Sequence, residues 1–82
     1  MTHTYATKGV CARAITIEMD DDHIINNVSF LGGCNGNTQG VASLAVGMKA
    51  EDVVTRLRGI NCGGRGTSCP DQLANAIEEL IK

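Results

Sequence analysis

The sequence predicts an α+β fold: a two- to three-stranded antiparallel sheet followed by two to three helices packed on one of its faces. Three observations support this class. Apolar and polar residues alternate in the first third of the chain, apolar residues recur at helical spacing afterwards, and a loop rich in glycine and asparagine separates the two parts. With 82 residues, the chain is expected to form a single domain over positions 1–82.

The clearest strand is predicted at residues 13–19, "RAITIEM". Ile15, Ile17 and Met19 share one face, and polar residues take the other, which is the period-two pattern of a half-buried strand. Three aspartates follow at residues 20–22 and are typical of a turn. A strand and a turn in this order predict one half of a hairpin.

Residues 23–33 resume the strand pattern and complete the predicted hairpin. Ile24, Val28 and Phe30 stand at even spacing, so they are expected on the buried face. A further strand around residues 4–8 would add a third member to the sheet. The antiparallel arrangement follows because a short turn joins the two main segments.

Two helices are predicted after the glycine-rich loop. The first covers residues 38–47, with Val41, Leu44 and Ala45 spaced to form its buried stripe. The second covers residues 50–57 and ends at a glycine.

The last helix has the strongest local signals. Pro70 suits the first helical position, which makes Cys69 the expected N-cap residue. Asp71 complements the positive end of the helix dipole, and Gln72 is placed to reach back as in a capping box. The buried stripe is predicted to consist of Leu73, Ile77, Leu80 and Ile81.

Composition restricts the partners and the size of the core. Tyr5 and Phe30 are the two aromatic residues, so the core must be thin, and a metal, cross-links or a homo-oligomer would offset the shortfall. The net charge of −2 gives no basic surface for nucleic acid. The sequence has no apolar run long enough for a membrane and no secretory signal pattern, which favours the cytoplasm.

Four cysteines carry the chemistry of the chain. In the cytoplasm they indicate a metal or redox site before a disulfide. Cys69 stands at a helix start, where unpaired N–H groups favour a thiolate. Cys34 precedes another predicted helix, Cys62 lies on the loop that leads to Cys69, and Cys11 precedes the first clear strand. Three interpretations remain open: ligands of zinc or of an iron–sulfur cluster, a redox pair of Cys62 and Cys69, or inert buried thiols.

Glycines flank these cysteines. Gly33, Gly63 and Gly64 would allow the backbone to close around a bound group, and Arg65 would offset thiolate charge or meet a partner. The same loops raise the question of nucleotide binding, because N–H groups at helix starts bind phosphate. Neither loop carries the lysine of a P-loop, nor the glycine fingerprint of a dinucleotide fold.

The segments "GVC", "FLGGCNGN" and "LRGINCGGRGTSCPD" together resemble the TSCPD domain family, which is named for the residues that stand here at 67–71. The resemblance covers about residues 5–82 and includes all four cysteines. It implies a link to deoxyribonucleotide synthesis, because this domain is also found appended to large, mainly cobalamin-dependent ribonucleotide reductases. A single small domain is too small to house the radical barrel and nucleotide pocket of a complete reductase.

A second similarity, over residues 28–58, is to iron–sulfur cluster scaffold proteins. The expected function is therefore an accessory domain with a zinc or iron–sulfur site, whose ligands are Cys11, Cys34, Cys62 and Cys69. The expected partner is a ribonucleotide reductase or a thiol-redox protein. Two alternatives are an oxidoreductase that uses Cys62 and Cys69 as a dithiol, and a metal-free module that docks on a reductase.

Overall fold

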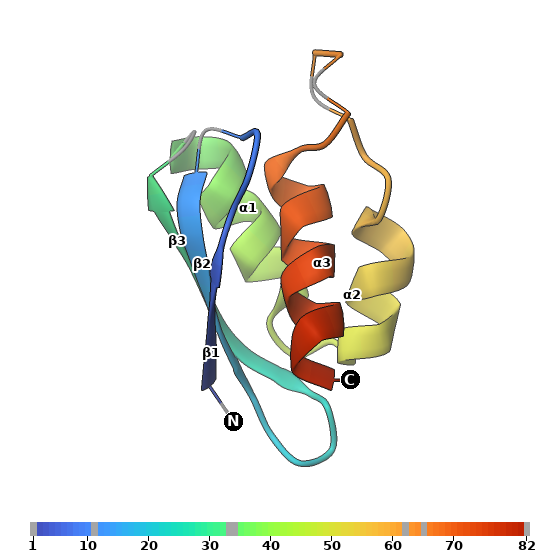
Figure 1. Cartoon of the computed structure of the whole chain (residues 1–82). Helices are drawn as coiled ribbons and strands as arrows, with labels where there is room; N and C mark the ends of the chain where they lie inside the picture. The colour runs from blue at the N-terminus through green and yellow to red at the C-terminus, as the bar shows by residue number, and fades with distance from the viewer. Residues whose placement is uncertain (1, 11, 33–34, 62, 65, 82) are drawn as a thin grey trace.

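The chain folds into three strands followed by three helices, which confirms the predicted α+β class (Figure 1). The computed structural model describes residues 2–10, 12–32, 35–61, 63–64 and 66–81. The strands are β1 (Thr2–Ala6), β2 (Ala12–Met19) and β3 (Ile25–Gly32). The helices are α1 (Asn35–Ala45), α2 (Ala50–Leu57) and α3 (Cys69–Ile81).

The strands form one antiparallel sheet in the order β1-β2-β3. The central strand β2 supplies the predicted apolar face: Ile15 and Ile17 are fully buried and Met19 is 1% exposed. The opposite face is polar, with the hydroxyls of Thr4 and Thr16 in contact across β1 and β2. The sheet therefore has one apolar face, against which the helices can pack.

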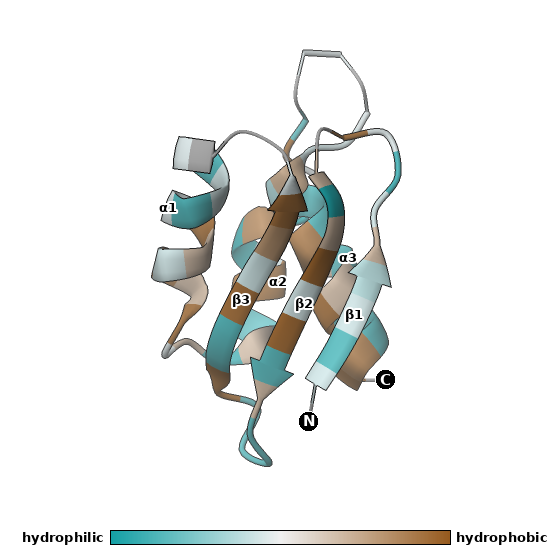
Figure 2. Cartoon of the chain, turned by 90° about the vertical axis from the view of Figure 1, so that its left-hand side faces the viewer, coloured by the Kyte–Doolittle hydropathy of each residue, from teal (hydrophilic) through white to brown (hydrophobic). Residues whose placement is uncertain are grey.

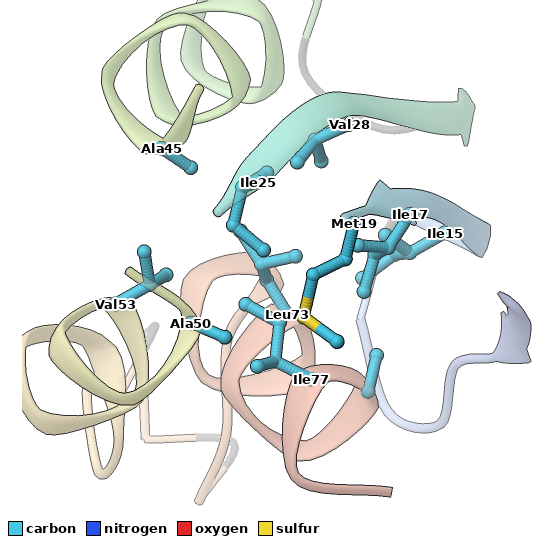
Figure 3. Packing of buried hydrophobic residues seen from close by; sticks show 11 residues of the cluster. Ile15, Ile17, Met19, Ile25, Val28, Ala45, Ala50, Val53, Leu73 and Ile77 are labelled. Atoms are coloured by element: carbon cyan, nitrogen blue, oxygen red, sulfur yellow. The ribbon is translucent and has the colours of Figure 1, made fainter. Parts of the chain in front are cut away.

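A β-bulge in β3 changes which isoleucine faces the core. The register passes from Glu18 opposite Asn27 to Met19 opposite Ile25, which leaves Asn26 as the inserted residue. Ile25 is consequently fully buried on the same side as Val28, although the two are three positions apart (Figure 3). The prediction that Ile24 shares this face is wrong, because even spacing assumes a regular strand.

The helices cover the apolar face of the sheet (Figures 1 and 2). Helix α3 packs against β1 and β2, α1 packs against β3, and α2 packs against α3. The core fills the space between these layers (Figure 3). Its fully or nearly fully buried members are Ile15, Ile17, Met19, Ile25, Val28, Ala45, Ala50, Val53, Leu73, Ala76 and Ile77.

Helix α1 differs from its prediction in two respects. It begins at Asn35, three positions before the predicted start at Thr38, so Thr38 lies within the helix and is 5% exposed. Ala45 is buried and Val41 partly buried, as expected, but Leu44 is 78% exposed. Spacing of i, i+3 and i+4 defines a stripe about 100° wide, and Leu44 lies beyond the part of it that meets the sheet.

The β2–β3 turn is joined to the start of α2. The Ala50 N–H donates to the His23 carbonyl at 2.7 Å, and His23 Nδ1 lies 2.6 Å from Glu51 Oε2. This hydrogen bond is the main reason why the pKa of Glu51 is lowered. At the beginning of β3, Ile25 exchanges backbone hydrogen bonds with Gly47 and Met48. The α1–α2 connection is thus tied to the same end of the sheet.

Candidate functional site

The site predicted from sequence lies partly within the described residues. Cys69, Gly63 and Gly64 are described. The other predicted site residues, Gly33, Arg65, Cys11, Cys34 and Cys62, lie outside the described residues.

Cys69 is the first residue of α3 and carries a free, partly exposed thiol. Within the described part of the chain, no hydrogen bond engages this thiol, and no three His, Cys, Asp or Glu side chains lie close enough together to hold a metal ion. Gly63 and Gly64 are exposed and have positive φ angles of 58° and 78°. Apart from the glycines themselves and the residues adjoining them in the chain, no described residue has an atom within 4 Å of the position that a Cβ on either glycine would take.

The cap of α3 is Ser68, so the prediction of Cys69 as N-cap is wrong by one residue. The Ser68 carbonyl accepts the first helical hydrogen bond, from the Gln72 N–H at 2.8 Å, and the Ser68 hydroxyl accepts from the Asp71 N–H at 3.1 Å. Pro70 is therefore the second helical residue, a position in the first turn where its missing N–H still costs nothing. Because Ser68 is the cap, the Cys69 side chain is not used to cap the helix.

Asp71 joins the α2–α3 loop to the helix start. Its carboxylate accepts hydrogen bonds from the Thr67 hydroxyl at 2.5 Å and from the Gly59 N–H at 2.7 Å. The Thr67 hydrogen bond, followed by the Gly59 hydrogen bond and the charge of Arg58, lowers the pKa of Asp71. The carboxylate is thus held in its charged form at the point where the loop leaves α2 and where α3 begins.

Gln72 joins the β1–β2 loop to the same place. Its side chain is 6% exposed; Oε1 accepts from the Lys8 N–H at 3.1 Å, and Nε2 donates to the Thr67 hydroxyl at 2.9 Å. Next to Lys8, Gly9 has a φ of +72°, and a Cβ there would lie 3.4 Å from the Thr67 methyl. Both ends of the Gln72 amide are thereby satisfied, as a buried amide requires.

The residues at 67–71 therefore divide into two kinds. Thr67, Ser68 and Asp71 make the hydrogen bonds that fix the helix start, and Pro70 begins the helix without a donor to satisfy. Within the described contacts, Cys69 has no such task. Sequence reasoning missed the roles of Thr67 and Ser68. The Ser-x-x-Asp spacing was the available signal for the cap, because Ser is a stronger capping residue than Cys.

The described residues bonded to the other cysteines lie at the same end of the molecule as Cys69. The starts of β2, α1 and α3 and the loop between α2 and α3 all occupy this end (Figure 1). In the sheet, Ala12 pairs with Gly32, which brings the start of β2 beside the end of β3. Within the loop, the Asn61 side chain accepts from the Gly66 N–H at 2.7 Å.

The family comparison agrees with the motif. The model of the TSCPD domain matches residues 1–81, almost the whole chain. No curated protein and no solved structure resembles the chain closely enough to count as a match. Among the described residues, no helix has the length and apolar character needed to cross a membrane. The matched range leaves out a single residue, and the chain therefore belongs to the TSCPD domain family.

Proposed function

We propose that the chain is a small accessory domain whose four cysteines, Cys11, Cys34, Cys62 and Cys69, hold a zinc ion. An iron–sulfur cluster is the second choice for the same ligands. The observation that carries the proposal is the position of Cys69. It sits at the start of α3 among residues fixed by hydrogen bonds, and its own thiol is free and partly exposed. A thiol held in this way suits a ligand, because it loses little freedom on binding.

The arrangement of the described neighbours supports shared ligation. In the sequence, Cys11 directly precedes β2, Cys34 directly precedes α1, and Cys62 stands between α2 and α3. The starts of β2 and α1 and the loop between α2 and α3 lie at the end of the fold where α3 begins (Figure 1). Four thiolates satisfy tetrahedral zinc completely, which is the usual composition of a structural zinc site. The flanking Gly33, Gly63 and Gly64 would let the backbone follow the metal closely, and Arg65 would offset the negative charge.

The biological role follows from the family rather than from the geometry. The TSCPD domain resemblance links the chain to ribonucleotide reduction, and a ribonucleotide reductase or a thiol-redox protein is the proposed partner. The domain would support such an enzyme by binding to it.

Metal analysis tests the proposal. The protein is purified without oxygen and without chelator, and its metal content and free thiols are measured together. We expect about one equivalent of zinc, with thiols that react only after a chelator is added, and a lower thermal stability once the metal is removed. A metal-free protein with freely reactive thiols would contradict the proposal.

A pair of neighbouring variants separates loss of a ligand from loss of stability. Cys69→Ala removes the proposed ligand, whereas Ser68→Ala removes the helix cap and leaves every thiol in place. We expect Cys69→Ala to lose most of the metal and Ser68→Ala to retain it. If both variants lose metal to the same extent, the effect is one of folding, and Cys69 is not a ligand.

The same variants distinguish the two alternatives. A redox dithiol of Cys62 and Cys69 predicts a folded, metal-free Cys69→Ala protein that has lost turnover with a thiol reductant. A metal-free docking module predicts a Cys69→Ala protein that still binds its reductase partner as the wild type does.

A further inference from the structure

Charge is distributed unevenly along this chain. No Lys, Arg, Asp or Glu occurs in residues 24–48, a run that supplies all of β3 and α1. Of the described residues, four large hydrophobic ones are strongly exposed, and three of them come from this run: Leu31, Leu44 and Val46, at 62%, 78% and 45%. Depletion of charge together with exposed apolar side chains is the composition of an interface core.

Helix α1 has a low intrinsic helix propensity for its length. It contains two glycines, two asparagines, a threonine and a valine, all poor helix formers, so it depends on packing. Of its described side chains, Thr38 and Ala45 are buried, whereas Leu44 is exposed. A Cβ added at Gly36 or Gly40 would meet no described atom within 4 Å. Glycine inside a helix is less favourable than alanine, and no close contact within the described chain requires it there.

An apolar groove runs beside the exposed leucine. It lies between α1 and α2 and has a cavity volume of about 190 Å³, which is enough for a leucine side chain. Arg56 is the one charged residue among its described lining. Leu44 itself forms part of the wall. The other lining residues are Val41, Ala45, Met48, Val53 and Leu57.

We propose that two copies of this chain pair through α1 about a two-fold axis, with Leu44 of each copy seated in the groove of the other. The position of Leu44 on the wall of its own groove makes this arrangement self-complementary: an axis that passes beside Leu44 places each leucine over the opposite groove. Gly40, one turn before Leu44, would allow the second α1 to approach closely. Charge favours a second copy over a different protein, because a charge-free helix meets its own copy without like-charge repulsion and offers nothing to attract a charged partner.

The oligomeric state tests the pairing. Sedimentation velocity is run from about 1 μM to about 1 mM, the range of weak to moderate association, with reductant and chelator present. Under these conditions neither disulfides nor a bridging metal can produce a dimer, and circular dichroism establishes that the metal-free wild type is folded. We expect the wild-type mass to rise from 8.6 kDa towards twice that value. A wild type that stays at 8.6 kDa throughout overturns the proposal.

Two leucine variants identify the surface. Leu44→Arg is expected to raise the dimer dissociation constant at least roughly 100-fold, because two-fold symmetry removes two buried leucines at once and brings each new charge near Arg56. Leu31→Arg, at another strongly exposed leucine that lies outside the groove, is the control and should dimerise as the wild type does. Circular dichroism confirms that both variants fold. Dissociation by Leu31→Arg, or an unchanged constant for Leu44→Arg, overturns the proposal.

Discussion

Helices α1 and α3 both pack on the sheet, but their sequences hold them there by different means. Helix α3 buries five side chains and begins at a hydrogen-bonded cap. Helix α1 carries no charged residue and exposes Leu44, and among its described side chains Thr38 and Ala45 are buried. Helix α3 thus supplies more of the buried side chains, whereas α1 leaves a large apolar side chain exposed.

The largest expected difference between the helices concerns their leucines. Leu73 of α3 is fully buried, so Leu73→Ala should lower the free energy of unfolding by about 3 kcal/mol. Leu44 of α1 is 78% exposed, so Leu44→Ala should change it by less than about 0.5 kcal/mol in the monomer. Urea denaturation at low protein concentration measures both. Similar losses in the two variants would mean that α1 is anchored as firmly as α3.

Acid should reveal the contribution of Asp71 to the start of α3. Asp71→Asn weakens hydrogen bonds that a charged oxygen accepts, and we expect a loss of about 1.5 kcal/mol at pH 7. Because the fold lowers the pKa of Asp71 from its ordinary 3.8, the stabilisation is fully present above that value and is lost as the pH falls through the lowered pKa. Unfolding free energies of both proteins from pH 7 to pH 2 should therefore converge in acid. If the difference in unfolding free energy between the two proteins did not change with pH, the charge of Asp71 would not be its cause.

A smaller effect distinguishes Ser68 from Cys69 at the same helix start. Ser68→Ala should cost about 1 kcal/mol in metal-free protein, because the hydroxyl caps the Asp71 N–H. Cys69→Ser, measured under the same conditions, should cost less than about 0.5 kcal/mol. Thermal unfolding in the presence of chelator measures both. The reverse order would restore Cys69 as the cap.

Two glycines, Gly40 within α1 and Gly9 beside Thr67, are expected to have effects of opposite sign. Gly40→Ala in α1 should stabilise the monomer by up to about 1 kcal/mol, since the added methyl meets open space and alanine favours the helix. Gly9→Ala should instead destabilise by about 1 kcal/mol, because φ is +72° and the Thr67 methyl stands 3.4 Å away. Denaturant midpoints decide the signs. A destabilising Gly40→Ala would mean that α1 itself needs the glycine.

Local patterns in the sequence were enough to predict most of the fold. Alternation identified β2 and its buried face, and helical spacing identified α2 and the buried stripe of α3. The errors have specific causes. The bulge at Asn26 changes which residues of β3 face the core, and a periodic pattern cannot reveal such an insertion. In α1, Leu44 has the helical spacing expected of a buried residue but is exposed.

The candidate site was less predictable because its contacts are not local. The hydrogen bonds from the Gly59 N–H to Asp71 and from the Lys8 N–H to Gln72 join segments whose proximity cannot be inferred from sequence spacing. Cys69 could be located at the helix start from sequence alone. Whether Ser68 or Cys69 caps the helix could be decided only from atomic positions, because the two residues are adjacent.

The hydrogen bond between Lys8 and Gln72 spans 64 positions, most of the length of the chain. Contacts of such high sequence separation form slowly, since the intervening chain must first be brought together. During synthesis, the surroundings of Cys69 cannot be completed until the last helix has left the ribosome. A nascent chain therefore presents its three earlier cysteines before the hydrogen bonds at the start of α3 can form.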